Sequence, residues 1–220
     1  MKNNHRFSKS ARAAVYRVIK ERRDMRHFRP DPVDPATLNR ILEAAHHAPS
    51  VGLMQPWRFI RITEPDLRTA ITTLVEEERI QTAAALAERS DEFMRLKIEG
   101  IRECGELLVA ALSDKREQHI FGRRTLPEMD LASVACAIQN LWLAARAEGL
   151  GMGWVSLFDP VQLAQLLMMP AGSKPIAILC LGHVEAFYPA PMLIRENWAQ
   201  AHPLQDLLFH NTWGCTQSST

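Results

Sequence analysis

The sequence lacks the features of a membrane span, a disulfide framework or a nucleic-acid surface. No apolar run reaches the roughly 20 residues that cross a bilayer, and the first twenty residues lack the apolar core of a signal peptide. The four cysteines contain no C-x-x-C pair, so we expect reduced thiols, three of them buried and Cys215 in a tail. The formal net charge is only +1, without a single basic run. We therefore expect a cytoplasmic protein that binds neither membrane nor nucleic acid.

The composition is that of an ordinary globular protein. Of the 220 residues, 47% are hydrophobic and 23% charged, which suits a single domain over residues 1–220. The polar ends, residues 1–10 and 216–220, are expected to fray. Apolar periodicity predicts helices at 11–22, 35–48, 130–148 and 159–168, with two more within 67–100. Apolar runs predict strands at 57–63, 107–112, 153–158 and 175–184. Strands that alternate with helices indicate an α/β or α+β fold with one layered sheet.

The first segment with chemical potential is Arg22-Arg23-Asp24-Met25-Arg26, directly after the first helix. Guanidinium groups offer planar forks of donors, so three of them in five residues suit a phosphate. The alternative is a solvated helix end, where cations relieve the negative helix terminus. Asp24 among three arginines is expected to be ionised.

The second segment is the loop Ala48–Trp57, which leads from a helix into a strand. Two prolines restrict its backbone, and Gly52 permits close approach of a ligand. Ser50 and Gln55 offer hydrogen bonds to a polar ring edge. An ordinary helix-to-strand connection is the alternative, but a rigid, apolar loop of this length favours a binding role.

The third segment, Gly149–Ser156, is rich in glycine. It follows a helix and enters a strand, whereas a dinucleotide fingerprint needs the reverse order, so we exclude a Rossmann site. We expect the glycines to end the helix and to admit a flat ligand beside the strand. The adjacent pair His46-His47 does not predict a metal site, because neighbouring helix residues point about 100 degrees apart.

Together these segments resemble the nitroreductase-like flavoproteins. The arginine segment, the Ala48–Trp57 loop and the run Gln139–Ser156 occur in the order typical of that family. The likeness extends from about Ala13 to Trp213. It implies an α+β sandwich with a mixed central sheet flanked by helices. It also implies an interlocked homodimer that binds FMN in two sites at its interface.

The resemblance assigns roles to individual residues. The residues expected to bind FMN are Arg22, Arg23, Asp24, Met25, Arg26, Ser50, Gly52, Gln55, Leu96 and Ser156. Within this set, Asp24 and Ser156 are the expected catalytic pair, and Ser50, Gly52 and Gln55 are expected beside the isoalloxazine ring. Residues 76–100 are expected to cover the flavin, with Leu96 where this lid meets the ring. Asp130 and Ser133 are expected to begin a helix at the dimer interface.

One stretch departs from the family pattern. Members that the chain most resembles carry basic residues in a C-terminal stretch, which here reads Trp198–Pro203 without arginine or lysine. Either the N-terminal arginines suffice for the phosphate, or Arg195 or His202 takes that place.

The implied activity is specific. Asp24, Asp130 and the sequence Gly153-Trp154-Val155-Ser156 resemble the members that fragment reduced FMN with molecular oxygen. Their products are 5,6-dimethylbenzimidazole, the lower ligand of vitamin B12 (cobalamin), and erythrose 4-phosphate. One alternative is an NAD(P)H-dependent flavin or nitro reductase that keeps its FMN intact, and another is a non-enzymatic flavin-binding module. The reducing equivalents come either from NAD(P)H directly or from a separate flavin reductase.

Overall fold

The computed structural model describes residues 5–215, which its contacts divide into two compact units. The first ends at Phe187 and the second begins at Tyr188. The expected single domain stays a prediction. Residues 1–4 and 216–220, where fraying was expected, lie outside the described residues. Fraying through residue 10 was wrong, because a helix begins at Lys9 with the Ser8 side chain as its cap.

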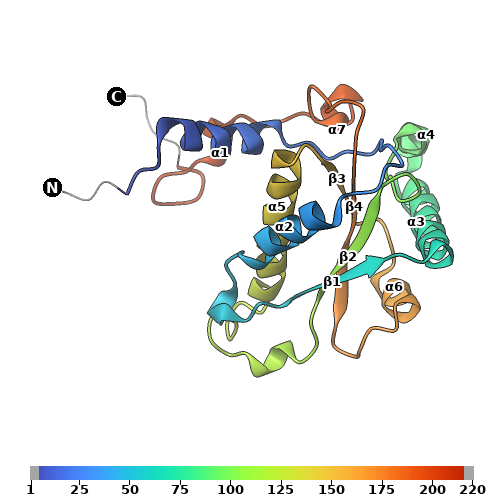
Figure 1. The fold of residues 1–220 in the computed structure, drawn as a ribbon, viewed down its shortest axis with the longest axis horizontal. Coiled ribbons are helices and arrows are strands. Elements are labelled where there is room, and N and C mark those ends of the chain that lie inside the picture. Colours follow the sequence, from blue (N-terminus) through green and yellow to red (C-terminus); the bar gives the residue numbers. More distant parts are fainter. Residues whose placement is uncertain (1–4, 216–220) are drawn as a thin grey trace. The chain divides into compact units, whose positions relative to one another are not determined.

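The first unit is built around a four-stranded sheet with the order β1-β2-β4-β3 (Figure 1). Its strands are β1 (Trp57–Ile62), β2 (Glu106–Leu112), β3 (Gly151–Val155) and β4 (Lys174–Gly182). All three pairings between these strands are antiparallel. The α+β class is confirmed. The expected mixed sheet is not, because β1 to β4 form an antiparallel sheet. Parallel pairing occurs at the isolated bridge between Asp24 and Met152.

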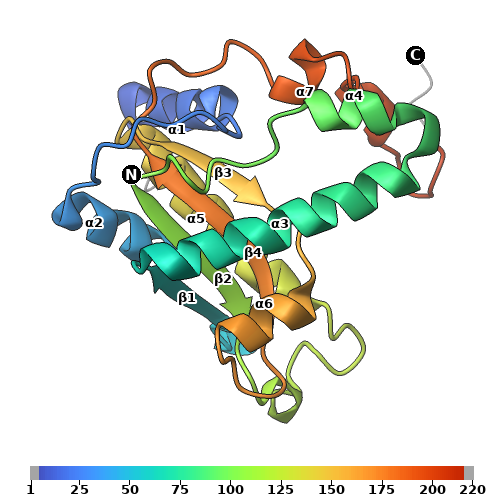
Figure 2. The same ribbon diagram turned by 90° about the vertical axis from the view of Figure 1, so that its right-hand side faces the viewer.

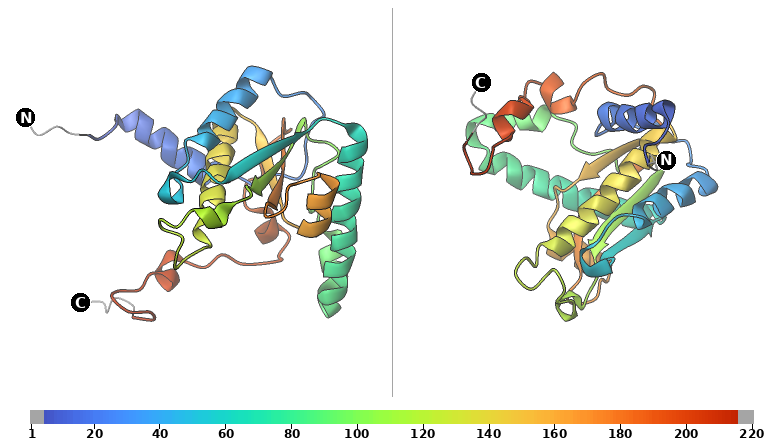
Figure 3. Two further views of the ribbon diagram at one scale, coloured as in Figure 1. Left: turned by 90° about the horizontal axis from the view of Figure 1, so that it is seen from below. Right: turned by 90° about the vertical axis from the view of Figure 1, so that its left-hand side faces the viewer.

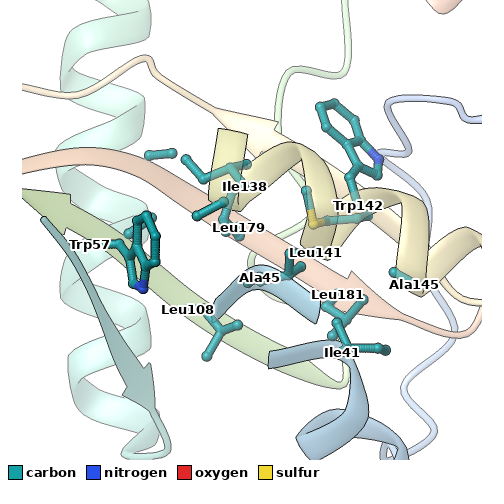
Figure 4. Close-up of a cluster of buried hydrophobic side chains, with 14 of the residues drawn as sticks. Ile41, Ala45, Trp57, Leu108, Ile138, Leu141, Trp142, Ala145, Leu179 and Leu181 are labelled. Atoms are coloured by element: carbon teal, nitrogen blue, oxygen red, sulfur yellow. The ribbon is translucent and has the colours of Figure 1, made fainter. Parts of the chain in front are cut away.

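Helices cover both faces of the sheet (Figure 2). One face carries α2 (Pro35–His46) and α5 (Met129–Ala147), and the other carries α3 (Pro65–Ala85) and α6 (Pro160–Leu166). Side chains of a strand alternate between the faces, so β2 divides its residues between two cores. Leu108 and Ala110 join the α2–α5 core, whereas Leu107 and Val109 join the α3–α6 core. Figure 4 shows how Ile41, Leu141 and Leu181 meet in the first of these cores.

The helix boundaries follow from capping chemistry that is visible in the sequence. Asp34 caps α2 by accepting from the backbone N–H of Thr37 at 2.8 Å, and Pro35 occupies the first turn. Gly149, with φ of +78°, follows the end of α5. The helix α1 (Lys9–Glu21) has no buried residue within this chain, and Val15 and Ile19 are about half exposed. Cys136 on α5 is also exposed, so the expectation of three buried thiols was wrong. No helix among the described residues has the length and apolar character to span a membrane.

The segment predicted as two helices between residues 67 and 100 contains α3, a short 3₁₀ turn at Ala87–Arg89 and α4 (Ser90–Arg95). Helix α3 continues past the edge of the sheet toward α4 (Figure 2). The second unit contains α7 (Met192–Arg195) and a 3₁₀ turn at Leu204–Leu207.

Candidate functional site

The arginine segment lies against the edge strand β3. The backbone N–H of Met25 donates to the carbonyl of Met152 at 2.9 Å, and Met25 is 1% exposed. Because β3 pairs with β4 on its other side, the segment extends the sheet at this edge by one short bridge. The five residues after α1 are therefore held by backbone contacts in a defined place, not solvated as a free helix end.

Two glycines of β3 make this contact possible. A Cβ on Gly153 would lie 2.3 Å from the carbonyl oxygen of Met25, and a Cβ on Gly151 would lie 2.5 Å from Val184 Cγ1 and 3.1 Å from the Met25 Cγ. A side chain at position 153 would push the arginine segment away, and one at position 151 would displace both Val184 and Met25. The expectation that these glycines admit a flat ligand beside the strand is corrected, because the chain's own residues occupy that space.

Asp24 is held between a cation and a backbone donor. Its Oδ2 accepts from Arg26 Nη2 at 2.6 Å, and its Oδ1 accepts from the backbone N–H of Trp154 at 3.0 Å. Arg26 is 7% exposed and also donates to the Trp154 carbonyl at 2.9 Å. These bonds fix the carboxylate beside β3, while 39% of the Asp24 side chain stays exposed.

The two other arginines lie at the end of α1. The Arg22 guanidinium lies over the Trp142 ring, with Cζ 4.3 Å from the ring centroid. The Trp142 ring nitrogen donates to the carbonyl of Arg23 at 3.2 Å, and Arg23 Nη1 donates to the Lys20 carbonyl at 2.8 Å. Trp142 of α5 thus fixes the direction in which the segment leaves the helix.

Burial raises the pKa of the Asp24 carboxyl, and this outweighs the lowering by Arg26, by the Trp154 N–H and by Arg22. The sequence-based expectation that the arginines keep Asp24 ionised took account of the nearby charges but not of desolvation, which acts in the opposite direction. A raised pKa brings the carboxyl closer to neutral pH, where a group that exchanges protons is most effective.

Ser156 directly follows β3 and is exposed. It stands two residues beyond Trp154, whose backbone N–H binds Asp24, so the Cα atoms of Trp154 and Ser156 are about 7 Å apart. The structure therefore places the expected catalytic pair at the same edge of the sheet. No partner of the Ser156 hydroxyl is recorded among the described residues.

The Ser50–Gln55 loop lies at the start of β1, the opposite edge strand. The Ser50 hydroxyl accepts from the backbone N–H of Gln55 at 3.0 Å, which closes the loop. Val51–Leu53 form a 3₁₀ turn in which Gly52 has φ of +52°. Because Gly52 and Leu53 are exposed, the loop presents its tip outward.

These two groups of predicted site residues do not meet within one chain. Trp57 pairs with Leu112 and Leu112 with Lys174, whereas Val155 pairs with Ile178, four residues further along β4. Three strand spacings amount to about 14 Å across the sheet, and four residues to about 13 Å along it. Gln55 and Ser156 of one chain therefore cannot contact the same flat ring.

The expected lid begins on α3 and ends near the arginine segment. Leu96 is 7% exposed, and its carbonyl accepts from Arg79 Nη2 of α3 at 3.1 Å. A Cβ on Gly100 would lie 2.9 Å from the carbonyl oxygen of Arg26. The end of the lid is thus packed against the segment expected to bind FMN, whereas its covering role stays a prediction.

Sequence reasoning missed several residues that build this site. Trp142 and Trp154 position the arginine segment, but in the sequence they indicated only a buried helix and a strand. Arg116 and Arg123 contact the Asp130 carboxylate at 2.8 and 3.2 Å. Their spacing of seven residues within an irregular stretch carried no recognisable signal. In the second unit, Arg195 lies over the Tyr188 ring, with Cζ 5.3 Å from the centroid, and its expected phosphate contact stays a prediction.

Residues 19–183 match the model of the nitroreductase family. The chain belongs to this family. A curated 5,6-dimethylbenzimidazole synthase from Rhodospirillum rubrum is 41% identical over 208 residues, which cover 92% of this chain and 97% of the relative. The family and the branch indicated by the sequence are thereby confirmed.

Solved structures show the same fold. A BluB-like flavoprotein from Clostridium difficile matches 90% of this chain and 99% of its own, with a TM-score of 0.70 at 17% identity. An iodotyrosine deiodinase bound to FMN and 3-iodo-L-tyrosine matches 80% of this chain and 92% of its own, with a TM-score of 0.65 at 24% identity.

Substitution of Gly153 tests the contact between β3 and the arginine segment. We expect Gly153→Ala to reduce the free energy of unfolding by about 1–3 kcal/mol through overpacking and to speed hydrogen exchange at the Met25 amide. Gly149→Ala is the control for the Met25 amide: its φ of +78° strains an alanine, but its Cβ meets no atom within 4 Å, so exchange at Met25 should stay parental. A protected Met25 amide in Gly153→Ala would contradict the account.

The raised pKa of Asp24 predicts a direction of pH dependence. The folded state holds the Asp24 proton more tightly than the unfolded state, so this stabilisation is present below the ordinary aspartate pKa. It is lost as pH rises through the folded-state pKa. Compared with Asp24→Asn, the parent should lose stability across that window in denaturant titrations of FMN-free protein. A relative gain with rising pH would show that ion pairing dominates instead.

Proposed function

We propose that the chain binds FMN and, with oxygen, fragments reduced FMN to 5,6-dimethylbenzimidazole and erythrose 4-phosphate. The similarity to a curated 5,6-dimethylbenzimidazole synthase over 97% of its length supports a role in synthesis of the cobalamin lower ligand. The single observation that carries the finer proposal is Asp24. Its carboxylate is fixed by Arg26 and the Trp154 N–H, has a raised pKa, and lies beside β3, the strand that Ser156 directly follows.

The residues present fit FMN. Arg22, Arg23 and Arg26 carry three positive charges against one negative charge on Asp24, which leaves an excess suited to a phosphate monoester. The negative charge of a carboxylate repels a phosphate, so phosphate binding does not explain Asp24. A role near the sugar explains it better. Reduced FMN, when bound, supplies both the reactivity toward oxygen and the carbon skeleton of the benzimidazole.

The chain contributes orientation and proton transfer. Arg26 and the Trp154 N–H each hold one oxygen of Asp24, so the carboxylate keeps one orientation. In that position it would accept or return a proton at the ribityl chain of a bound FMN. The exposed Ser156 hydroxyl would donate a hydrogen bond to the ring.

A complete site needs two copies of the chain. Asp24 and Ser156 lie at the β3 edge, whereas Ser50, Gly52 and Gln55 lie at the β1 edge. A symmetric homodimer brings the β3 edge of one chain to the β1 edge of its partner. The exposed apolar residues of α1 support this assembly. Val15 and Ile19 are about half exposed in the single chain, and exposed apolar side chains that lie together typically mark a surface that another chain covers.

The family also contains reductases, and the alternative function is an NAD(P)H-dependent flavin or nitro reductase that keeps its FMN intact. A non-enzymatic flavin-binding module would return reduced flavin to oxidised FMN in air. The products of aerobic incubation separate the three functions. Direct NAD(P)H oxidation by the purified chain would identify the source of electrons, and its absence would point to a separate flavin reductase.

Arg22→Ala tests the phosphate contact. Loss of one charge-assisted hydrogen bond costs about 1.5–3 kcal/mol, so FMN affinity measured by fluorescence titration should fall by roughly 10- to 150-fold. Arg17→Ala is the control, because Arg17 lies one turn earlier and its side chain is 75% exposed. Equal affinity of Arg22→Ala and the parent would reduce the cluster to a structural helix end.

Asp24→Asn tests the chemistry. The variant keeps the shape of the side chain but loses its charge and basicity. We expect it to bind FMN and to let reduced FMN reoxidise while forming little or no 5,6-dimethylbenzimidazole, measured by chromatography and mass. Ser156→Gly should behave in the same way.

The matched control is Asp31→Asn, which makes the same change in an exposed ion pair with Arg29 and should leave the yield unchanged. Full yield from Asp24→Asn would remove its catalytic role. If the parent leaves FMN intact after incubation, the proposed fragmentation is excluded and the reductase becomes the favoured function.

A further inference from the structure

The Ser50–Gln55 loop has a backbone that its own sequence does not favour. Leu53 and Gln55 have φ of +53° and +46°, in the left-handed region that residues with a Cβ rarely adopt. Such a conformation persists only where the surroundings determine it. Within the loop, the bond from the Gln55 N–H to Ser50 Oγ is one support, so further support must come from neighbouring elements.

The first turns of α5 provide part of that support. The backbone N–H of Val51 donates to Ser133 Oγ at 3.1 Å, and Ser133 in turn donates to the Met129 carbonyl at 2.6 Å. Ser133 is 4% exposed, so this connection is shielded from water. The loop is therefore tied to the beginning of α5 through one buried hydroxyl.

The irregular stretch before α5 provides the rest. A Cβ on Gly52 would lie 2.9 Å from the Phe121 carbonyl oxygen, and a Cβ on Gly122 would lie 2.5 Å from Val51 Cγ2. The two backbones touch where each has a glycine. Phe121, however, is 84% exposed, so apolar burial does not keep this stretch in place.

Buried charges hold it instead. Asp130 Oδ2 accepts from Arg116 Nε at 2.8 Å and from Arg123 Nη2 at 3.2 Å, and none of these side chains is more than 13% exposed. Arg123 Nη1 also donates to the Arg116 carbonyl at 2.6 Å, and Arg116 Nη1 to the Gly172 carbonyl at 2.5 Å. The carboxylate thus fixes both ends of the stretch from residue 116 to residue 123, in which Phe121 and Gly122 contact Gly52 and Val51 (the stretch is yellow-green in Figure 3).

A buried ionic cluster is weak support for stability as such, because desolvation offsets the attraction between its charges. Its attested benefit is the selection of one arrangement among several. Here the selected arrangement is that of a loop with unfavourable φ angles at the edge of the proposed flavin site.

We propose that Asp130, acting through Arg116 and Arg123, is a positioning residue that holds the Ser50–Gln55 loop in the conformation that receives the flavin ring. The proposal rests on the proposed function for the identity of the ligand. The holding of the loop does not depend on it.

Hydrogen exchange of FMN-free protein tests the holding directly. Asp130→Asn keeps the shape but leaves two buried cations without their anion. We expect faster exchange at the Val51 and Gln55 amides and an unchanged rate at the Met25 amide, which bonds to Met152 at the other edge of the sheet. Asp31→Asn, the same change in an exposed pair, should alter none of the three.

FMN titration of the same variants tests the consequence. If the loop populates its binding conformation a tenth of the time, the dissociation constant rises about tenfold. Ser133→Ala, which removes the acceptor of the Val51 N–H, should weaken FMN binding in the same direction while leaving Asp130 in place. Should Asp130→Asn fail to fold, Arg123→Lys keeps both charges and removes the planar donor fork, and the same two amides should exchange faster.

A folded Asp130→Asn or Arg123→Lys variant with parental exchange at Val51 and Gln55 overturns the proposal. So does faster exchange at Met25 to the same degree, which indicates general loosening. If the parent binds FMN but forms no benzimidazole, the proposed reaction fails and the positioning of the loop still stands on the exchange rates.

Discussion

The order of the strands, with β1 and β3 at opposite edges, determines what this chain can do alone. Each edge strand carries one half of the predicted site: the arginine segment, Asp24 and Ser156 at β3, and the Ser50–Gln55 loop at β1. The strand register separates the halves by about 14 Å across the sheet and about 13 Å along it. Any ligand that uses Ser156 and Gln55 together must therefore lie between two chains. This topology supports the proposed homodimer independently of the family resemblance.

Each half is held in place by close contacts between specific residues. At the β3 edge, Gly153 leaves room for the backbone of Met25 and Gly151 for its side chain, and Arg26 and Trp154 orient Asp24. At the β1 edge, Ser133 and the buried Asp130 cluster surround a loop with positive φ angles. Both halves join α5, whose beginning contacts the loop and whose Trp142 contacts the arginine segment. Helix α5 is therefore the rigid element that relates the two halves of the site within one chain.

Local chemistry made much of the fold predictable. Asp34-Pro35 marked the start of α2, a continuous apolar run gave β2, and the long periodic segment gave α5. The start of β3 was not predictable, because Gly151 and Gly153 are poor strand formers and are required by the distant Met25. The raised pKa of Asp24 could not be predicted for a related reason. The nearby arginines are visible in the sequence, whereas the burial that raises the pKa exists only after the segment has docked on β3. Likewise, the residues of the site were grouped correctly by segment, but nothing in the sequence placed the two groups at opposite edges.

Complementation between two inactive variants tests most directly whether the site is shared between chains. Asp24→Asn inactivates the part of the site at β3. Gln55→Trp inactivates the part at β1, because the larger side chain occupies the space proposed for the flavin ring. Produced together in one cell, the two chains form mixed dimers in which one site carries both changes and the other carries none. Random pairing then restores about a quarter of the parental 5,6-dimethylbenzimidazole yield, because half of the dimers hold one intact site. If the co-produced variants stay as inactive as each alone, although mixed dimers form, the claim that each site is built from two chains is contradicted.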